Sequence, residues 1–159
     1  MQQIIKFIIV GLGVRGAHWV NVISNHELAK ISAFVDIKQP SKKNISLYKS
    51  QKIPFFTSFP KALEELECNA VLIATPPEYH YDQVMLAFKK GKHIICEKPL
   101  TESLKESIEL YKASLKFKLK LMVGMNFRYL STSQYIRKVV SKSELGPIAV
   151  SYTHLRAND

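Results

Sequence analysis

The fold is decided by the stretch IIKFIIVGLGVRG, which covers residues 4–16. Its first seven residues are apolar except for one lysine, as expected for a strand that is buried on both faces of a sheet. The pattern GxGxxG follows at once and opens a helical segment. In this context the pattern predicts a dinucleotide-binding unit, whereas the same glycines elsewhere would indicate only an ordinary strand-to-helix turn.

Each glycine of this pattern has its own structural role. Gly11 permits a tight turn, Gly13 lets the backbone approach a pyrophosphate, and Gly16 lets the helix pack closely against the strand. The helix N-terminus, which carries Val14 and Arg15, then offers free N–H groups and a positive dipole to the phosphates. We therefore expect all five residues to belong to a cofactor site.

Asp36 stands twenty residues beyond the last of these glycines, at the end of the second predicted strand. A carboxylate at this position can accept hydrogen bonds from both ribose hydroxyls of the adenosine half, and it repels a 2′-phosphate. This favours NAD over NADP as the cofactor. Lys38 lies two residues further on and could neutralise a 2′-phosphate, so NADP stays an alternative.

Short apolar runs alternate with helical periods, which is typical of parallel strands joined by crossover helices. The pattern predicts an α/β fold of the Rossmann type with a doubly wound parallel sheet. The predicted strands are Ile4–Val10, Ile31–Asp36, Ile53–Phe56, Ala70–Ala74, His93–Cys96 and Lys120–Met125. Three apolar stripes are expected to pack helices on the sheet, and they comprise Val14, Ala17, Val20, Asn21 and Ile23, then His80, Val84, Ala87 and Phe88, then Leu104, Ile108, Tyr111 and Leu115.

The remaining local signals place helix ends and connections. Thr101 is expected to open the helix of the third stripe, and two further helices are expected over Lys61–Glu67 and Gln134–Lys142. The lysine- and serine-rich segment Ser41–Lys52 fits either a ragged helix or a surface loop.

The segment ATPPEYH, residues 74–80, leaves the fourth predicted strand at its carboxyl end, where ligands bind in open parallel sheets. We expect Thr75 and Pro76 to border the ribose or pyrophosphate of the cofactor. His80 falls in the first turn of the next helix, where a ligand contact and a packing role are equally open.

Glu97, Lys98 and Pro99 follow the fifth predicted strand and should reach the same edge of the sheet. An ammonium group there can hydrogen-bond a substrate hydroxyl, orient it against a nicotinamide and help move the proton that accompanies hydride transfer. On the residues alone, a surface salt bridge between Lys98 and Glu97 is the competing interpretation.

Composition narrows the functional classes. The 159 residues, 47% of them hydrophobic, suffice for one core, and without an apolar run of eighteen residues we expect neither a signal peptide nor a membrane partner. Cys68 and Cys96 lack metal-ligand spacing and predict no metal site, but reduced thiols in a cytoplasmic protein. The net charge of +10 arises mainly from lysines at polar positions of amphipathic stretches, which indicates a solvated exterior and no nucleic-acid partner.

Taken together, these segments resemble the glucose-fructose oxidoreductase / inositol dehydrogenase / MocA (Gfo/Idh/MocA) family of nicotinamide-dependent oxidoreductases. The resemblance rests on the order of five features over nearly the whole chain: GLGVRG at 11–16, Asp36, ATPPEYH at 74–80, GKHIICEKPL at 91–100 and VGMNFRY at 123–129. The EKP segment is the most specific of them.

The resemblance implies that Lys98 is the catalytic lysine, that Glu97 and Pro99 help to place it near the nicotinamide, and that the bond between Lys98 and Pro99 is cis. It also implies a small-molecule substrate, a sugar, cyclitol or related polyol, that exchanges hydride with the cofactor. Members of the family continue into a second α/β domain that supplies further catalytic residues, commonly an Asp and a His, and the usual interface of a homo-oligomer. Without that domain Lys98 would have half a site.

The expected organisation is therefore a cofactor domain over residues 1–125 and a connecting helix with the start of a second domain over 126–149. Val150–Ala157 reads like the translation of a common sequencing-transposon end, which predicts a non-native tail over 150–159. Ile148–Tyr152 also fits the first strand of the second domain. Two functions stay open: an oxidoreductase or a fragment of one, and a non-catalytic dinucleotide-binding sensor or regulatory module.

Overall fold

The computed structural model describes residues 3–38, 53–143, 146–148 and 150. It divides into two units, Met1–Gly124 and Met125–Asp159. The helix or loop expected within 41–52, and residues 151–159 of the tail expected over 150–159, lie outside the described residues.

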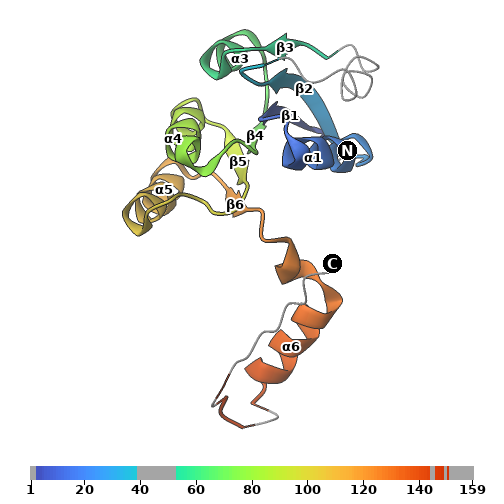
Figure 1. The fold of residues 1–159 in the computed structure, drawn as a ribbon, viewed down its shortest axis with the longest axis vertical. Helices are drawn as coiled ribbons and strands as arrows, with labels where there is room; N and C mark the ends of the chain where they lie inside the picture. The colour runs from blue at the N-terminus through green and yellow to red at the C-terminus, as the bar shows by residue number, and fades with distance from the viewer. Residues whose placement is uncertain (1–2, 39–52, 144–145, 149, 151–159) are drawn as a thin grey trace, which may run out of the picture. The chain divides into compact units, whose positions relative to one another are not determined.

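The first unit is built on a six-stranded sheet in which every neighbouring pair is parallel (Figure 1). The strand order is β3-β2-β1-β4-β5-β6, the order of a Rossmann fold, so the predicted fold class is confirmed. The strands are β1 (Ile5–Val10), β2 (Ala29–Val35), β3 (Phe55–Phe56), β4 (Ala70–Ile73), β5 (His93–Cys96) and β6 (Leu121–Val123). All six predicted strands are present, with ends that differ by a few residues.

Helices cover both faces of this sheet, and β1 contributes alternate residues to each face. Ile8 and Val10 lie in one apolar cluster, and Phe7 and Ile9 lie in the other. The helical elements are α1 (Val14–Ser24), α3 (Phe59–Glu65), the short 3-10 helix η1 (Pro77–Tyr79), α4 (His80–Lys89) and α5 (Leu104–Phe117). The first cluster includes buried residues of α3, α4 and α5, and the second includes buried residues of α1.

The predicted stripe of α4 is confirmed, because His80, Val84, Ala87 and Phe88 are all buried. The stripe predicted for α1 is confirmed in part: Val20 and Ile23 are buried, whereas Val14 is 89% exposed. Val14 begins the helix at the edge of the sheet, so no neighbouring element covers it.

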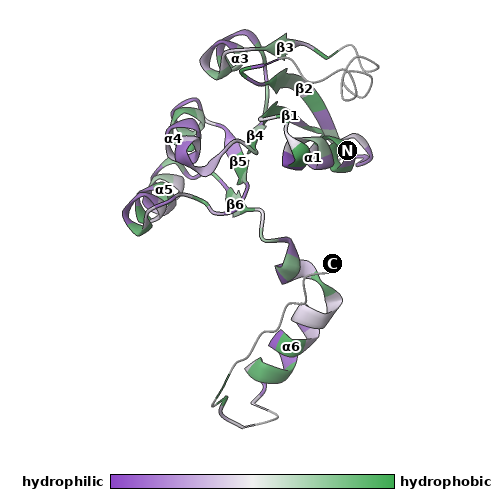
Figure 2. Ribbon diagram, in the orientation of Figure 1, coloured by the Kyte–Doolittle hydropathy of each residue, from purple (hydrophilic) through white to green (hydrophobic). Residues whose placement is uncertain are grey.

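The stripe predicted for α5 is wrong. Its four residues are exposed, and the helix instead buries Leu110, Ala113 and Ser114. Figure 2 shows hydrophobic stretches on this helix alternating with hydrophilic ones. Both faces of α5 carry apolar groups, and the face with the small residues packs inward, because small side chains permit close approach.

The start of α5 also differs from the expectation. Ser103 caps the helix, and its hydroxyl accepts the N–H of Glu106 at 3.1 Å. Thr101 is buried, and its hydroxyl bonds the carbonyl oxygen of Ser103 at 2.7 Å and the hydroxyl of Ser107 at 2.6 Å. Thr101 therefore fixes the chain that enters the helix rather than the helix end itself.

The second unit contains the 3-10 helix η2 (Asn126–Tyr129) and α6 (Ser131–Ser141), so the predicted helix begins three residues earlier than expected. Neither element buries a residue. In the part of the chain that the structure describes, no helix has both the length and the apolar composition needed to cross a bilayer.

Replacement of Leu110 by alanine tests which face of α5 is buried. Because the Leu110 side chain is fully buried, Leu110→Ala should lower the free energy of unfolding by about 2–5 kcal/mol. Leu104→Ala is the matched control on the same helix, and it should change stability by less than about 0.5 kcal/mol because Leu104 is 77% exposed. Urea unfolding measures both, and the reverse ranking would show that the predicted face packs on the sheet after all.

Candidate cofactor site

The candidate site is a pocket of about 730 Å³ at the carboxyl ends of β1, β2 and β4, within the size range of small-molecule sites. Seven of the residues predicted from the sequence line it: Gly11, Gly13, Val14, Arg15, Asp36, Thr75 and Pro76. Ten others complete the lining: Val10, Val35, Ile37, Lys38, Thr57, Phe59, Ala74, Glu78, Tyr79 and Gln83. None of these ten was predicted as a site residue, although Lys38 was weighed beside Asp36 and three of them, Ala74, Glu78 and Tyr79, stand in the segment ATPPEYH.

The turn after β1 explains the three glycines. Gly11 has φ +87°, a left-handed conformation, and a Cβ built on it would lie 2.7 Å from the backbone carbonyl of Ala74. A Cβ on Gly16 would collide with the backbone oxygen of Gly11. A Cβ on Gly13 would meet nothing within 4 Å. Gly11 and Gly16 are thus required by the fold, whereas Gly13 leaves open space in the pocket.

Helix α1 directs its N-terminus at this space. Gly13 is the N-cap residue of the helix, and among the described residues no side chain accepts a hydrogen bond from this end of the helix. The N-terminal N–H groups of a helix attract anions, and a phosphate can approach them where no Cβ intervenes. The geometry therefore fits the pyrophosphate of a dinucleotide.

Asp36 lies directly after β2 and binds the glycine turn. Its Oδ2 accepts the backbone N–H of Leu12 at 2.7 Å, and its Oδ1 accepts the backbone N–H of Lys38 at 3.2 Å. Each carboxylate oxygen can accept more than one hydrogen bond, so both can still receive a hydroxyl. Asp36 combines a role in shaping the turn with an acceptor at the pocket wall.

Thr75 and Gln83 extend the polar lining on the other side of the pocket. The hydroxyl of Thr75 donates to Oε1 of Gln83 at 2.8 Å, which ties the loop after β4 to helix α4. This bond fixes the orientation of the Gln83 amide. Gln83 lies eight residues from Thr75 in sequence and was not predicted as a site residue.

The structure places His80 outside the pocket lining. Its ring is fully buried, with Nδ1 2.9 Å from the carbonyl oxygen of Pro99 and Nε2 2.8 Å from the carbonyl oxygen of Thr75. His80 therefore joins the loop after β4 to the loop after β5. Of the two interpretations left open by the sequence, the packing role describes these contacts.

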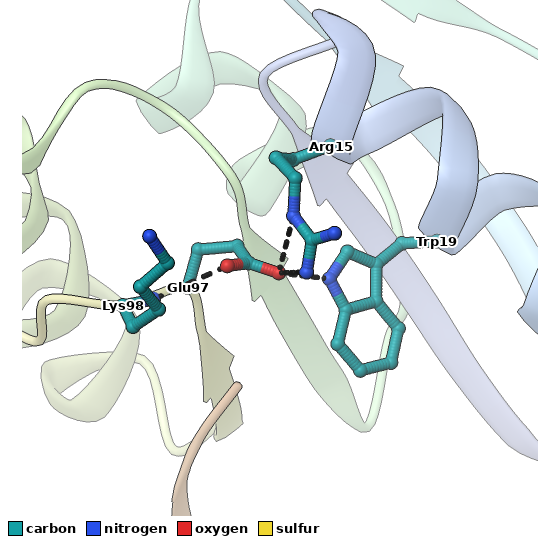
Figure 3. A network of polar contacts seen from close by, with 4 residues as sticks. All are labelled: Arg15, Trp19, Glu97 and Lys98. Carbon is teal, nitrogen blue, oxygen red and sulfur yellow. Dashed lines mark hydrogen bonds and ion pairs between the residues drawn. The ribbon is translucent and has the colours of Figure 1, made fainter. Parts of the chain in front are cut away.

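Glu97 is the centre of a polar network at the end of β5 (Figure 3). Its side chain is only 6% exposed, and its Oε1 accepts Nη2–H of Arg15 at 2.8 Å, Nε–H of Arg15 at 3.2 Å and Nε1–H of Trp19 at 2.7 Å. Its Oε2 accepts the backbone N–H of Lys98 at 3.3 Å. The network joins helix α1 to the loop that carries Lys98.

These donors decide the protonation of Glu97. Burial is the largest single influence and would raise its pKa, but hydrogen bonds from Trp19, Arg15 and the Lys98 amide, together with the Arg15 charge, outweigh it. The net effect lowers the pKa below its ordinary value of 4.5. Glu97 is therefore a charged acceptor at neutral pH and not a proton donor.

Lys98 is exposed, and the peptide bond between Lys98 and Pro99 is cis, as the resemblance implied. Figure 3 shows its side chain extending away from the Glu97 carboxylate. Within the described residues no ion pair joins Lys98 to a carboxylate, and Glu97 pairs with Arg15 instead. The salt bridge between Lys98 and Glu97 that the sequence left open is not formed. Gly16, Glu97 and Lys98 all lie outside the pocket lining itself.

The glycine turn predicts that alanine at Gly16 lowers stability, whereas alanine at Gly13 weakens cofactor binding. Gly16→Ala should lower the free energy of unfolding by about 1–3 kcal/mol or more, because its Cβ collides with backbone. Gly13→Ala should stay within about 1 kcal/mol of the wild type, yet weaken NADH binding at least about tenfold, because the Cβ blocks the approach of the pyrophosphate. Thermal unfolding and calorimetric titration measure the two effects, and unchanged NADH affinity in Gly13→Ala would contradict this assignment.

Glu97 predicts a pH dependence of stability. Because its pKa is lowered in the folded state, its contribution is fully present above the unfolded value near 4.5 and is lost as the pH falls through the folded pKa. The wild type should therefore lose stability below about pH 5, and Glu97→Gln should lose less over the same range. Urea unfolding at pH 7 and pH 4 makes the comparison, and equal losses in the two proteins would refute it.

Comparison with known proteins agrees with this geometry. Residues 5–125 match the model of the Gfo/Idh/MocA family, which is described as an oxidoreductase family with an NAD-binding Rossmann fold. The chain is 27% identical over 149 residues to 2,7-anhydro-N-acetylneuraminate hydratase of Escherichia coli (strain K12). This alignment covers 94% of the chain and 39% of that protein. The chain is 28% identical over 150 residues to inositol 2-dehydrogenase of Corynebacterium glutamicum (strain R), with coverage of 93% and 44%.

A solved structure shows the same fold. Scyllo-inositol dehydrogenase from Lactobacillus casei, with bound cofactor NAD(H) and scyllo-inositol, superposes with a TM-score of 0.80 at 24% identity, over 91% of this chain and 43% of that one. The chain thus spans between 39% and 44% of the length of these three proteins. It belongs to the Gfo/Idh/MocA oxidoreductase family, whose NAD-binding Rossmann domain it contains.

Proposed function

We propose that this chain is the cofactor domain of an NAD(P)-dependent dehydrogenase, which transfers hydride between the dinucleotide and a sugar, cyclitol or related polyol. The observation that carries the proposal is the open space at Gly13, bordered by the uncapped end of α1 and by the Asp36 carboxylate. These groups fit a pyrophosphate and an adenosine ribose respectively. The NAD-binding description of the family supports the same ligand.

The residues of the pocket divide the binding task among them. The backbone at Gly13, Val14 and Arg15 would hold the phosphates, and Asp36 would accept the ribose hydroxyls. Thr75 and Pro76 would border the ribose or pyrophosphate from the loop after β4. When bound, the nicotinamide accepts or donates the hydride, and the protein supplies binding, orientation and charge.

Lys98 would act on the substrate. Its exposed ammonium, unpaired with any carboxylate of the described residues, can donate a hydrogen bond to a hydroxyl or carbonyl oxygen and so orient it. The same Nζ can pass a proton to or from that oxygen as the hydride moves. Glu97 stays charged and holds the loop, so we assign the proton to Lys98 and not to its neighbour.

The inositol 2-dehydrogenase among the relatives supports a cyclitol or related polyol as the substrate class. We propose that catalysis also needs groups from a second domain of the kind that the resemblance implies. That domain would select the polyol and provide any homo-oligomer interface. Buried free thiols at Cys68 and Cys96 fit a reducing compartment, and we propose the cytoplasm.

Calorimetric titration with NADH and NADPH tests this proposal. The wild type should bind NADH more tightly than NADPH, and Asp36→Asn should shift the ratio toward NADPH by about tenfold, because the repulsion of a 2′-phosphate is removed. The asparagine keeps one carbonyl oxygen for the Leu12 N–H, so the turn survives.

Asp82→Asn is the matched control, since Asp82 is exposed on α4 and does not line the pocket. It should leave the ratio unchanged. Absence of binding to either dinucleotide by a folded wild type would reject the proposed function.

A further inference from the structure

Trp19 is linked through Glu97 to the loop between β5 and α5, residues 97–103, which carries Lys98 and is called the Lys98 loop below. The sequence did not suggest this link. Arg15 and Trp19 are four residues apart on α1, so their side chains lie on the same face of the helix. Both donate to the same oxygen of Glu97, with Nε1 of Trp19 at 2.7 Å and Nη2 of Arg15 at 2.8 Å (Figure 3). Trp19 is partly buried against the apolar cluster on the α1 side of the sheet, which anchors its ring.

Gly124, directly after β6, also packs closely against the Glu97 carboxylate. A Cβ built on Gly124 would lie 3.2 Å from Oε1 and 3.3 Å from Cδ of Glu97. The backbone N–H of Gly124 is itself fixed on the carbonyl oxygen of Cys96 at 2.7 Å. Glu97 is thus held between α1 and β6, and its second oxygen holds the Lys98 amide.

The two donors on α1 differ in what else they can bind. Arg15 has a side chain that is 45% exposed, and it lines the pocket next to the helix N-terminus. Its guanidinium has five N–H groups, so an anion at that end of the helix can compete for them with Glu97. The indole of Trp19 has one N–H and no charge, and a phosphate therefore competes for it far less.

We propose that Trp19 is a positioning residue, which holds Glu97, and through it the Lys98 loop, when the phosphates of the dinucleotide share Arg15. The proposal rests on the proposed function, because it assumes a dinucleotide in the pocket. It assigns Arg15 to two partners, Glu97 and the ligand, and Trp19 to Glu97 alone.

The test compares NADH with ADP-ribose, which has the same phosphates but lacks the nicotinamide. Trp19→Phe keeps an aromatic ring and removes the N–H that reaches Glu97. It should weaken NADH about tenfold, because in the proposed function the Lys98 loop would border the nicotinamide end, and it should change ADP-ribose less than about twofold. In a Glu97→Met background the same substitution should have no further effect, because the acceptor is gone.

Equal weakening of both ligands by Trp19→Phe would mean that Trp19 only supports the fold, and no weakening of either would mean that Glu97 does not need it. Both outcomes overturn the proposal while leaving the proposed function intact. A folded wild type that binds neither ligand overturns the proposed function, and this inference with it.

A second measurement needs no variant. Trp19 is the single tryptophan of the chain, so its indole N–H gives one unambiguous proton resonance. On saturation with NADH, the indole N–H should keep the chemical shift of a hydrogen-bonded group and should still exchange slowly with water. The chemical shift of the Arg15 Nε–H should change. An indole resonance that moves to the shift of a free indole would overturn the proposal even if Trp19→Phe failed to fold.

Discussion

The close contact between Gly16 and Gly11 is the constraint on which the rest of the first unit depends. No side chain fits between the first turn of α1 and the carbonyl of Gly11, so the helix begins directly at the carboxyl end of β1. This start brings the helix N-terminus to the edge of the sheet where β1, β2 and β4 end. It also brings the N–H of Leu12 to the carboxylate of Asp36, which ties the turn to β2. That single close approach therefore sets where the N-terminus of α1 meets the pocket.

The parts of the structure that could be predicted from the sequence are those with local causes. The apolar run of β1 and the glycines after it specify a buried strand and a tight turn within a dozen residues. In α4 the buried positions, His80 and Val84 among them, form the single apolar stripe of an amphipathic helix, so its inner face is unambiguous. Asp36 was found because its distance from the glycines reflects the length of one helix and one strand.

The parts that could not be predicted depend on partners that are distant in sequence. Helix α5 has apolar groups on two faces, and only its packing against the neighbouring elements selects the face with Leu110 and Ala113. Trp19 lies 78 residues from its acceptor Glu97, and Arg15 lies 82 residues away. The spacing of Arg15 and Trp19 on one helix face was visible, but nothing local indicated that a buried carboxylate would meet them. The contact of His80 with the carbonyl of Pro99 likewise joins two loops that are 19 residues apart in sequence.

The network around Glu97 also explains why Lys98 is left available. A buried carboxylate needs a compensating charge and hydrogen bonds, and the nearest cation along the chain is Lys98 itself. Arg15 supplies that charge from α1, and the donors from Trp19 and the Lys98 backbone satisfy the remaining acceptor capacity. Because the carboxylate is already neutralised, the ammonium of Lys98 gains little by turning inward and extends away from it, as Figure 3 shows. Glu97 thus holds the Lys98 loop through the backbone N–H of Lys98 and forms no ion pair with the Lys98 side chain. This arrangement requires that the charge that neutralises Glu97 come from another element, which here is α1.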